Sequence, residues 1–224
     1  MLDHVSKKRL ALALFDIDGT LRRVRDPWVQ LHQYLGVHQQ AEGLVELWQR
    51  REISYEEWAR LDASLWRGYS RQTMAAALQE NPLRKGAREL IAWFRAKSIP
   101  CVAISTGLSV FNDITARDLG LAEVISNELH FDGGVCTGRI IVKVGEDNKG
   151  AVMREILARY RVGTEQVVAF GDGRADIPVL AAAGLGVAVC PYADEVARCA
   201  DHVVASEPID SALEVVQNHF HIPG

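Results

Sequence analysis

The hydrophobic positions of this chain form short runs that alternate with helix-like segments. Each run is nearly continuous in apolar residues and is bounded by turn residues. The predicted strands are Leu10–Phe15, Ile99–Ile104, Glu123–Leu129, Gln166–Phe170, Leu185–Cys190 and a short one at His202–Ala205. Such strands are typical of a parallel sheet whose two faces are both covered by helices. Because crossover connections are right-handed, we predict an α/β fold with a doubly wound, mostly parallel sheet.

Polar residues follow three of these strands directly. They come after Phe15, after Ile104 and after Phe170. In a doubly wound sheet, ligands bind at the carboxyl ends of the strands. We therefore expect these polar residues to meet in one crevice, although they lie far apart in the sequence.

Two segments interrupt the alternation. Between Leu21 and about Lys85 the pattern predicts several amphipathic helices and no strand, and one of them begins at a capping box, Ser54-Tyr55-Glu56-Glu57. This segment also holds four of the five tryptophans, which are expected to pack together: Trp28, Trp48, Trp58 and Trp66. The second interruption, His130–Val144, alternates around Asp132-Gly133-Gly134 and predicts a β-hairpin.

The helical insertion after the first strand defines the domain organisation that we predict. Residues 1–20 and 86–224 form the core domain, and residues 21–85 form a helical cap domain. A cap inserted directly after the first strand is expected to lie over the crevice as a lid. Its closure on a substrate would exclude water and could limit turnover.

The composition excludes several classes of function. The 224 residues carry a net charge of −4, and 48% of them are hydrophobic, which suits a globular domain with a large insertion. The slightly acidic balance is not that of a nucleic-acid-binding protein. No apolar stretch reaches the roughly 20 residues of a membrane span, and no signal peptide is expected. The four cysteines form no CxxC pair, so we expect reduced thiols in a cytoplasmic protein.

The stretch Asp16-Ile17-Asp18-Gly19-Thr20 is the most informative in the chain. Asp16 follows an apolar strand without a break, and in an extended strand Asp16 and Asp18 would share a face. Two carboxylates at the end of a buried strand are costly unless a cation or a proton compensates them. Mg²⁺ suits this role, because it prefers a few oxygen ligands, retained waters and a substrate phosphate.

Gly171-Asp172-Gly173-Arg174-Ala175-Asp176 follows the fourth strand in the same way. Asp172 would add a third carboxylate to the metal, and Asp176 a fourth to its surroundings. By itself, this segment could also be a common strand-to-helix turn with an Asx cap. The pairing with the first acidic stretch favours the metal site.

Ser105, Thr106 and Gly107 end the second strand before a helix that begins near Ser109. Hydroxyls and free N–H groups at a helix N-terminus can bind an anion, although Ser and Thr are also ordinary helix caps. Lys149 opens another amphipathic helix, where the macrodipole disfavours a cation. It is either placed for a task or simply solvated. Together these groups suit phosphoryl transfer, with an Asp as nucleophile and a second acid protonating the leaving oxygen.

The order of these motifs resembles the haloacid dehalogenase superfamily of phosphotransferases, and most closely its phosphoserine phosphatase-like branch. The resemblance runs from Leu10 to Val204. DIDGT is similar to the first family motif, IST to the second, DNKG to the third and GDGRAD to the fourth. The fold implied is a Rossmann-like core with a cap.

The resemblance implies a role for each matching residue. Asp16 would be the nucleophile and a Mg²⁺ ligand, and Asp18 the general acid/base, binding the metal through its backbone carbonyl. Ser105 would bind the phosphoryl group, with Thr106 and Gly107 donating backbone N–H groups. The remaining roles fall to three residues: Lys149 neutralises the phosphoryl group and the nucleophile, Asp172 ligates the metal, and Asp176 orients its surroundings.

Two positions depart from the phosphoserine phosphatase pattern. Arg25 stands where that branch has an acidic residue that contacts the substrate amino group, and Ala175 stands where it usually has Asn. The basic stretch Arg22-Arg23-Val24-Arg25 is either a solvated linker or a site that disfavours an ammonium group and favours an acid. Asp26 is a candidate for the missing carboxylate, and Arg174 for the missing polar contact.

The predicted function is Mg²⁺-dependent hydrolysis of a small phosphorylated metabolite through an aspartyl-phosphate. Asp18 argues against dehalogenation, which needs neither a protonated leaving group nor Mg²⁺. The alternatives are a phosphotransferase, a phosphatase for a sugar or acid phosphate, a phosphoryl-accepting signalling module and a catalytically silent binding protein. No nucleic acid or membrane is expected as a partner. The oligomeric state is left open, with a homodimer as one option.

Overall fold

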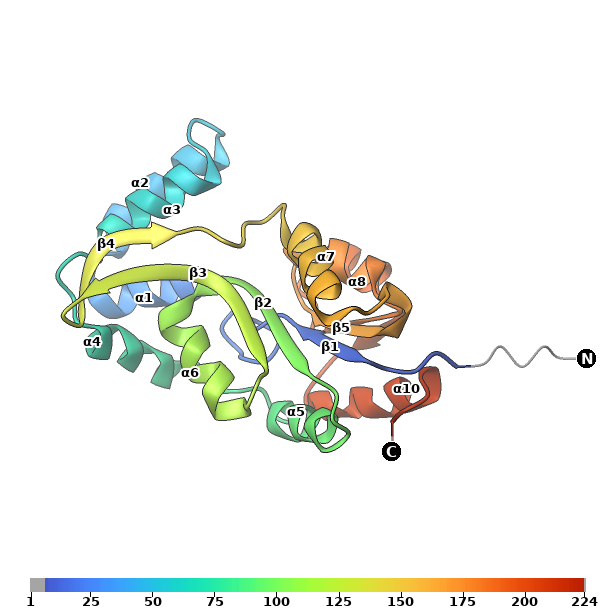
Figure 1. The fold of residues 1–224 in the computed structure, drawn as a ribbon. Coiled ribbons are helices and arrows are strands. Elements are labelled where there is room, and N and C mark those ends of the chain that lie inside the picture. Colours follow the sequence, from blue (N-terminus) through green and yellow to red (C-terminus); the bar gives the residue numbers. More distant parts are fainter. Residues whose placement is uncertain (1–6, 224) are drawn as a thin grey trace, which may run out of the picture.

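The computed structural model describes residues 7–223, and it is built on one seven-stranded sheet (Figure 1). The strand order is β4-β3-β2-β1-β5-β6-β7, and every neighbouring pair is parallel except β3 and β4. The strands are β1 (Leu12–Phe15), β2 (Cys101–Leu108), β3 (Glu123–Asp132), β4 (Val135–Ile141), β5 (Val167–Gly171), β6 (Leu185–Val189) and β7 (His202–Val204). This topology confirms the predicted doubly wound, mostly parallel sheet.

Helices cover both faces of the sheet, because alternate side chains of β1 point to opposite sides. Ala13 and Phe15 pack against α5 (Ala87–Ala96) and α10 (Ala212–His219), while Leu12 and Leu14 pack against α7 (Lys149–Tyr160) and α8 (Ile177–Ala182). Figure 1 shows these two helix pairs on opposite sides of the strands. Two other helices, α6 (Ser109–Leu119) and α9 (Asp194–Cys199), complete the layers.

The core rests on β1, whose four residues are all buried. The rings of Phe15 and Phe170 stack with centroids 4.7 Å apart, and the ring of Phe94 meets Phe15 edge-on at 5.9 Å. Complete burial of each such side chain stabilises the fold by about 1.5–3 kcal/mol. This packing holds the carboxyl ends of β1 and β5 side by side, where the acidic motifs begin.

Two strands run further than their hydrophobic patterns predict. Strand β2 was expected to end at Ile104, but it continues through Ser105, Thr106 and Gly107 to Leu108. Strand β3 continues past Leu129 to Asp132. Pairing between Leu108 and Asn127, after a register shift, extends β2, and antiparallel pairing with β4 extends β3 as far as Asp132. Polar residues therefore belong to these strands, where tertiary pairing outweighs local preference.

The secondary-structure elements between β1 and α5 are all helices. They are α1 (Pro27–Leu35), α2 (His38–Gln49), α3 (Tyr55–Ser64), α4 (Arg71–Ala76) and the 3₁₀ helix η1 (Ala77–Glu80). Ser54 caps α3 by accepting the N–H of Glu57, which is one of the two contacts of the predicted capping box. The aromatic cluster is also confirmed, since the ring of Trp58 lies 4.7 Å from that of Trp28 and 5.1 Å from that of Trp48. Helices α2 and α3 project from one end of the molecule (Figure 1).

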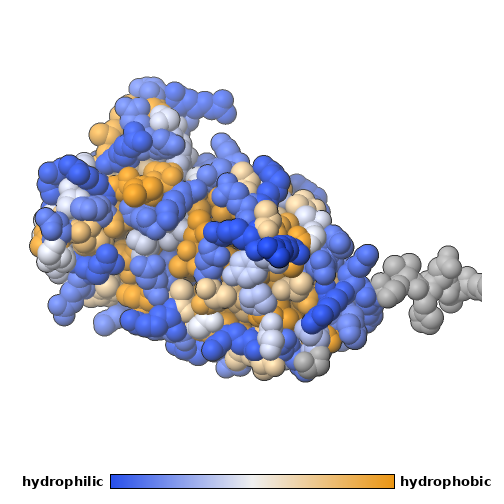
Figure 2. Space-filling view, viewed as in Figure 1, coloured by the Kyte–Doolittle hydropathy of each residue, from blue (hydrophilic) through white to orange (hydrophobic). Residues whose placement is uncertain are grey.

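The hairpin of β3 and β4 joins the sheet to this helical segment. Leu129, Cys136 and Ile140 of the hairpin share one apolar cluster with the tryptophans. Figure 2 shows a mainly hydrophilic face with an apolar patch over β4, the strand whose Val135 and Ile141 are exposed. Among the described residues, no helix combines the length and the apolarity that crossing a membrane requires.

Candidate active site

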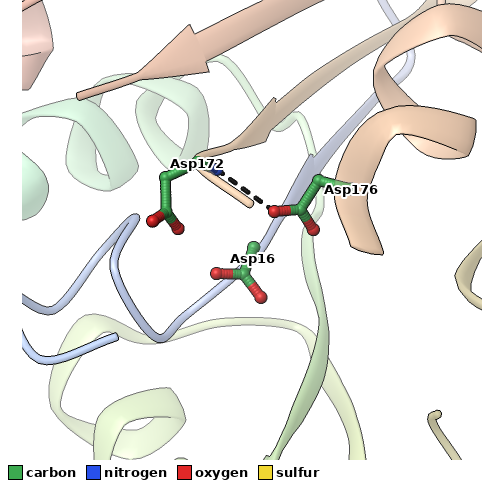
Figure 3. A group of neighbouring side chains, drawn as sticks. All are labelled: Asp16, Asp172 and Asp176. Carbon is green, nitrogen blue, oxygen red and sulfur yellow. Dashed lines mark hydrogen bonds between the residues drawn. The ribbon is translucent and has the colours of Figure 1, made fainter. Parts of the chain in front are cut away.

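Three carboxylates lie together at the carboxyl edge of the sheet (Figure 3). Asp16 follows β1, Asp172 follows β5, and Asp176 ends the 3₁₀ helix η3 (Arg174–Asp176). One carboxylate oxygen from each lies within 4.8 Å of the others, and all three residues are buried. The parallel pairing of β1 with β5 brings the first two together, since Phe15 is in register with Phe170.

Asp176 organises the turn that carries Asp172. Its Oδ2 accepts the backbone N–H of Asp172 at 3.1 Å, the contact drawn in Figure 3, and that of Gly173 at 3.0 Å. Its Oδ1 accepts a hydrogen bond from Lys149 Nζ at 2.7 Å. Both oxygens are thus occupied, which suits a residue that positions its neighbours.

Lys149 is the first residue of α7, and its side chain is 2% exposed. Its Nζ donates to Asp16 Oδ1 at 2.6 Å as well as to Asp176. Burial by itself lowers the pKa of this ammonium, but the charges of Asp16 and Asp176 outweigh that effect and raise the pKa above its usual range. Lys149 is therefore a buried side chain bound to two acids, and not a solvated lysine.

The buried carboxylates of this site outnumber the cationic side chains that contact them. Burial, with smaller contributions from neighbouring carboxylates, raises the pKa of Asp16 well above its usual value and that of Asp172 to about 6. Buried carboxylates of this kind are stabilised by a bound cation. Oxygen-only donors in a small cluster fit a hard divalent ion such as Mg²⁺. Asp16 and Asp172 are the residues that would hold it, with Asp176 beside them.

Asp18 has different partners from the other three acids. Its Oδ2 accepts a hydrogen bond from the hydroxyl of Ser105 at 2.8 Å. Burial raises the pKa of Asp18 to about 7, although that hydrogen bond opposes the shift. Strand β1 ends at Phe15, so Asp16 and Asp18 both lie beyond the end of the strand. A carboxyl group with such a pKa can both donate and accept a proton near neutral pH.

Ser105 uses its full hydrogen-bonding capacity. Besides donating to Asp18, its Oγ accepts the backbone N–H of Gly107 at 2.8 Å and the side-chain amide of Asn112 at 2.9 Å. A Cβ on Gly107 would overlap Asp18 Oδ2 and crowd Ser105 Oγ at 2.9 Å. Only glycine therefore fits between these two side chains.

Several residues at the site had no role assigned to them from the sequence. Thr20 Oγ1 donates to Asp172 Oδ1 at 3.0 Å, and Asn127 Nδ2 donates to the carbonyls of Thr106 and Val144, both at 2.9 Å. Trp28 Nε1 donates to the same Thr106 carbonyl at 3.1 Å, so the helical segment contacts the end of β2. Asn112 is a polar residue at a buried position, and that signal can be recognised only once the fold is known.

The match to a family model agrees with this geometry. Residues 13–181 match the haloacid dehalogenase-like hydrolases. The chain belongs to this family, and within it the chain is phosphoserine phosphatase-like.

Individual relatives support the second assignment. The chain is 32% identical over 179 residues to phosphoserine phosphatase SerB2 of Mycobacterium tuberculosis, a match that covers 79% of this chain but only 43% of that protein. It is 31% identical over 214 residues to a phosphoserine phosphatase of Albidiferax ferrireducens, covering 92% of this chain and 89% of the relative. A solved substrate-bound phosphoserine phosphatase complex shares the fold, with a TM-score of 0.77, 23% identity, and coverage of 93% and 99% of the two chains.

Proposed function

We propose that this protein hydrolyses the phosphomonoester of a small metabolite through a covalent phosphoryl-aspartate at Asp16. The observation that carries the proposal is the position of Asp16. Its Oδ1 is held by Lys149, whereas its Oδ2 meets no hydrogen-bond donor among residues 7–223. One oxygen is thus oriented and the other is free to attack phosphorus.

The first half-reaction transfers the phosphoryl group to the protein. Asp16 Oδ2 attacks phosphorus and the ester P–O bond breaks, while the carboxyl proton of Asp18 passes to the leaving oxygen. Lys149 would neutralise the equatorial oxygens. The hydroxyl of Ser105 and the backbone N–H groups of Thr106 and Gly107 would donate hydrogen bonds to them, once Ser105 releases Asp18 and Gly107 releases Ser105. Such positioning and charge neutralisation supply most of the catalysis in phosphoryl transfer.

The second half-reaction returns the protein to its starting state. The Asp18 carboxylate removes a proton from water, the resulting hydroxide attacks phosphorus, and the bond to Asp16 breaks to release inorganic phosphate. Alcohol and inorganic phosphate should therefore form in equal amounts. An excess of alcohol over phosphate in the presence of a second alcohol would instead indicate transfer to that acceptor.

A magnesium ion is the proposed cofactor. It would be held by Asp16, Asp172 and the backbone carbonyl of Asp18, and when bound it supplies positive charge that offsets the phosphate and the acids. Asp176 supports this site through its hydrogen bonds to the Asp172 turn. A cytoplasmic location is also proposed, and the four free thiols support it, since such thiols are typical of reducing compartments.

Removal of divalent metal is the experiment that tests this function. We expect EDTA to reduce hydrolysis of p-nitrophenyl phosphate to the rate without protein, and excess Mg²⁺ to restore it. Mg²⁺ alone should also raise the thermal midpoint, because a ligand at 100 times its Kd stabilises the native state by about 2.7 kcal/mol. Full hydrolysis in EDTA, or a thermal midpoint that does not change when Mg²⁺ is added, would contradict the proposal.

A methyl group at Gly107 is expected to impair catalysis more than folding. In Gly107→Ala the new Cβ would push apart Asp18 and Ser105, and misplacement of catalytic groups by about 1 Å can cost 10²-fold in rate. We expect kcat for p-nitrophenyl phosphate to fall about 10- to 100-fold, measured beside the thermal midpoint. The matched control is Gly43→Ala in α2, where nothing lies within 4 Å of the added Cβ. Equal activity in the two variants would refute the assignment of Ser105 and Asp18.

A further inference from the structure

The three arginines that follow the first acidic motif have different environments. Arg22 is buried and donates to Thr115 Oγ1 at 2.7 Å and to the carbonyl of Asn81. Arg23 pairs with Glu207, which is not one of the clustered acids. Arg25 alone reaches that cluster, where its Nε donates to Asp172 Oδ2 at 3.1 Å. The basic stretch is therefore neither a solvated linker nor a uniform patch.

The guanidinium of Arg25 is held in place yet remains accessible. Its Nη2 donates to the carbonyl of Cys190 at 2.9 Å, and its Cζ lies 5.5 Å from the centre of the Tyr192 ring. The side chain is nevertheless 46% exposed, whereas that of Asp172 is 2% exposed. Within the described part of the chain, Nη1 donates to no acceptor. A fixed guanidinium with free N–H groups presents the planar fork that matches a carboxylate.

Two acidic side chains of the neighbouring helical segment contact other groups of the protein. Asp26 Oδ1 accepts the backbone N–H groups of Trp28 and Val29, both at 3.0 Å, as the N-cap of α1. Asp62 is fully buried, with its Oδ2 2.8 Å from His32 Nε2. Asp26, the candidate carboxylate for a substrate ammonium, is thus engaged in capping through Oδ1. Arg25 adds a second cation, after Lys149, beside the metal-binding acids.

We propose that Arg25 selects substrates whose leaving alcohol carries a carboxylate, so that the preferred class is the phosphate ester of a hydroxy acid. This inference rests on the proposed phosphatase function. Asp16 and Asp172 belong to one cluster within 4.8 Å, and Arg25 touches Asp172. A group bound to the ester carbon would therefore lie within reach of the free edge of the guanidinium. An ammonium at the same position would face a fixed positive charge.

Three substrates of different charge test the inference. They are 2-phosphoglycolate, with a carboxylate; O-phosphoethanolamine, with an ammonium; and p-nitrophenyl phosphate, with neither. In the native protein with Mg²⁺, we expect kcat/KM for phosphoglycolate to exceed that for phosphoethanolamine at least about tenfold, the effect of one charge-assisted hydrogen bond. Arg25→Gln should remove most of this preference, mainly through a higher KM for phosphoglycolate, and Arg25→Glu should reverse it. Arg23→Gln is the matched control and should leave the preference unchanged.

The ratio between substrates separates specificity from a general effect on the site. Equal losses for all three substrates in Arg25→Gln would mean that Arg25 acts only by holding Asp172, and the inference would be wrong while the phosphatase function stands. A native preference for phosphoethanolamine would also overturn it. If none of the substrates is hydrolysed, p-nitrophenyl phosphate included, the proposed function fails and the inference fails with it. A loss of kcat/KM in Arg25→Gln that is confined to phosphoglycolate supports the inference.

Discussion

Replacement of Asp16 by asparagine is expected to abolish phosphomonoester hydrolysis while the fold remains intact. The amide has the shape of the carboxylate, but its oxygen is a poor nucleophile, so no phosphoryl-aspartate can form. We expect kcat for p-nitrophenyl phosphate to fall on the order of 10⁴-fold or more, as when other covalent nucleophiles are removed. Steady-state rates with Mg²⁺ measure this loss, and rapid acid quenching followed by mass spectrometry should show a phosphoryl adduct only in the native protein.

The fold should tolerate this change. Lys149 keeps its second partner, Asp176, and the cluster loses one of its mutually repelling charges. The thermal midpoint in EDTA should therefore stay equal or rise. Asp194→Asn in α9, an exposed acid outside the cluster, serves as the control and should retain native activity. Activity of Asp16→Asn within tenfold of the native rate would remove Asp16 from the role of nucleophile.

Replacement of Lys149 by methionine is expected to be the most destabilising single change at the site. Methionine fills a similar volume, but it leaves Asp16 and Asp176 buried without their shared counter-charge. Removing one partner of a buried ion pair typically costs about 3–5 kcal/mol. We expect a loss of this size in the free energy of unfolding, measured by urea denaturation in EDTA, together with hydrolysis near background.

A second lysine provides the comparison. Lys143 pairs with Glu128, but both side chains are more than two-fifths exposed, at 42% and 47%. Exposed pairs of this kind contribute about 0–1 kcal/mol, so Lys143→Met should change the unfolding free energy little. Added Mg²⁺ should recover part of the stability of Lys149→Met, because the ion compensates the same acids. Equal stability of the two variants would show that the Lys149 contacts contribute little to the folded state.

The order of elements and the identity of the acidic residues could be predicted from the sequence. Apolar runs of strand length, each followed by a helix, predict a parallel sheet because both faces of such a sheet are buried. Asp16 directly follows one predicted strand and Asp172 lies two residues after another, and neighbouring parallel strands bring such residues to one edge. The sequence also predicted that Lys149 opens a helix, and in the structure its Nζ donates a hydrogen bond to Asp16.

The partners of each side chain could not be predicted in the same way. The structure gives Asp18 a different partner from the other acids, because its carboxylate accepts a hydrogen bond from the hydroxyl of Ser105. Strand β2 continues through Ser105 because β3 pairs with its end, which the local residues do not signal. Asn112 and Asn127 became part of the site only through the contacts of α6 and β3.

The sequence by itself thus determined the helices and strands of this protein and the charged residues at the carboxyl edge of its sheet. Hydrophobic periodicity and turn residues act over a few neighbouring positions, so they can be recognised in the sequence itself. The environment of Arg25 was decided by tertiary structure alone, because Asp172 and Cys190 lie 147 and 165 positions further along the chain. Contacts at such separations depend on how whole strands and helices pack, and that packing determined which of three neighbouring arginines faces the acids.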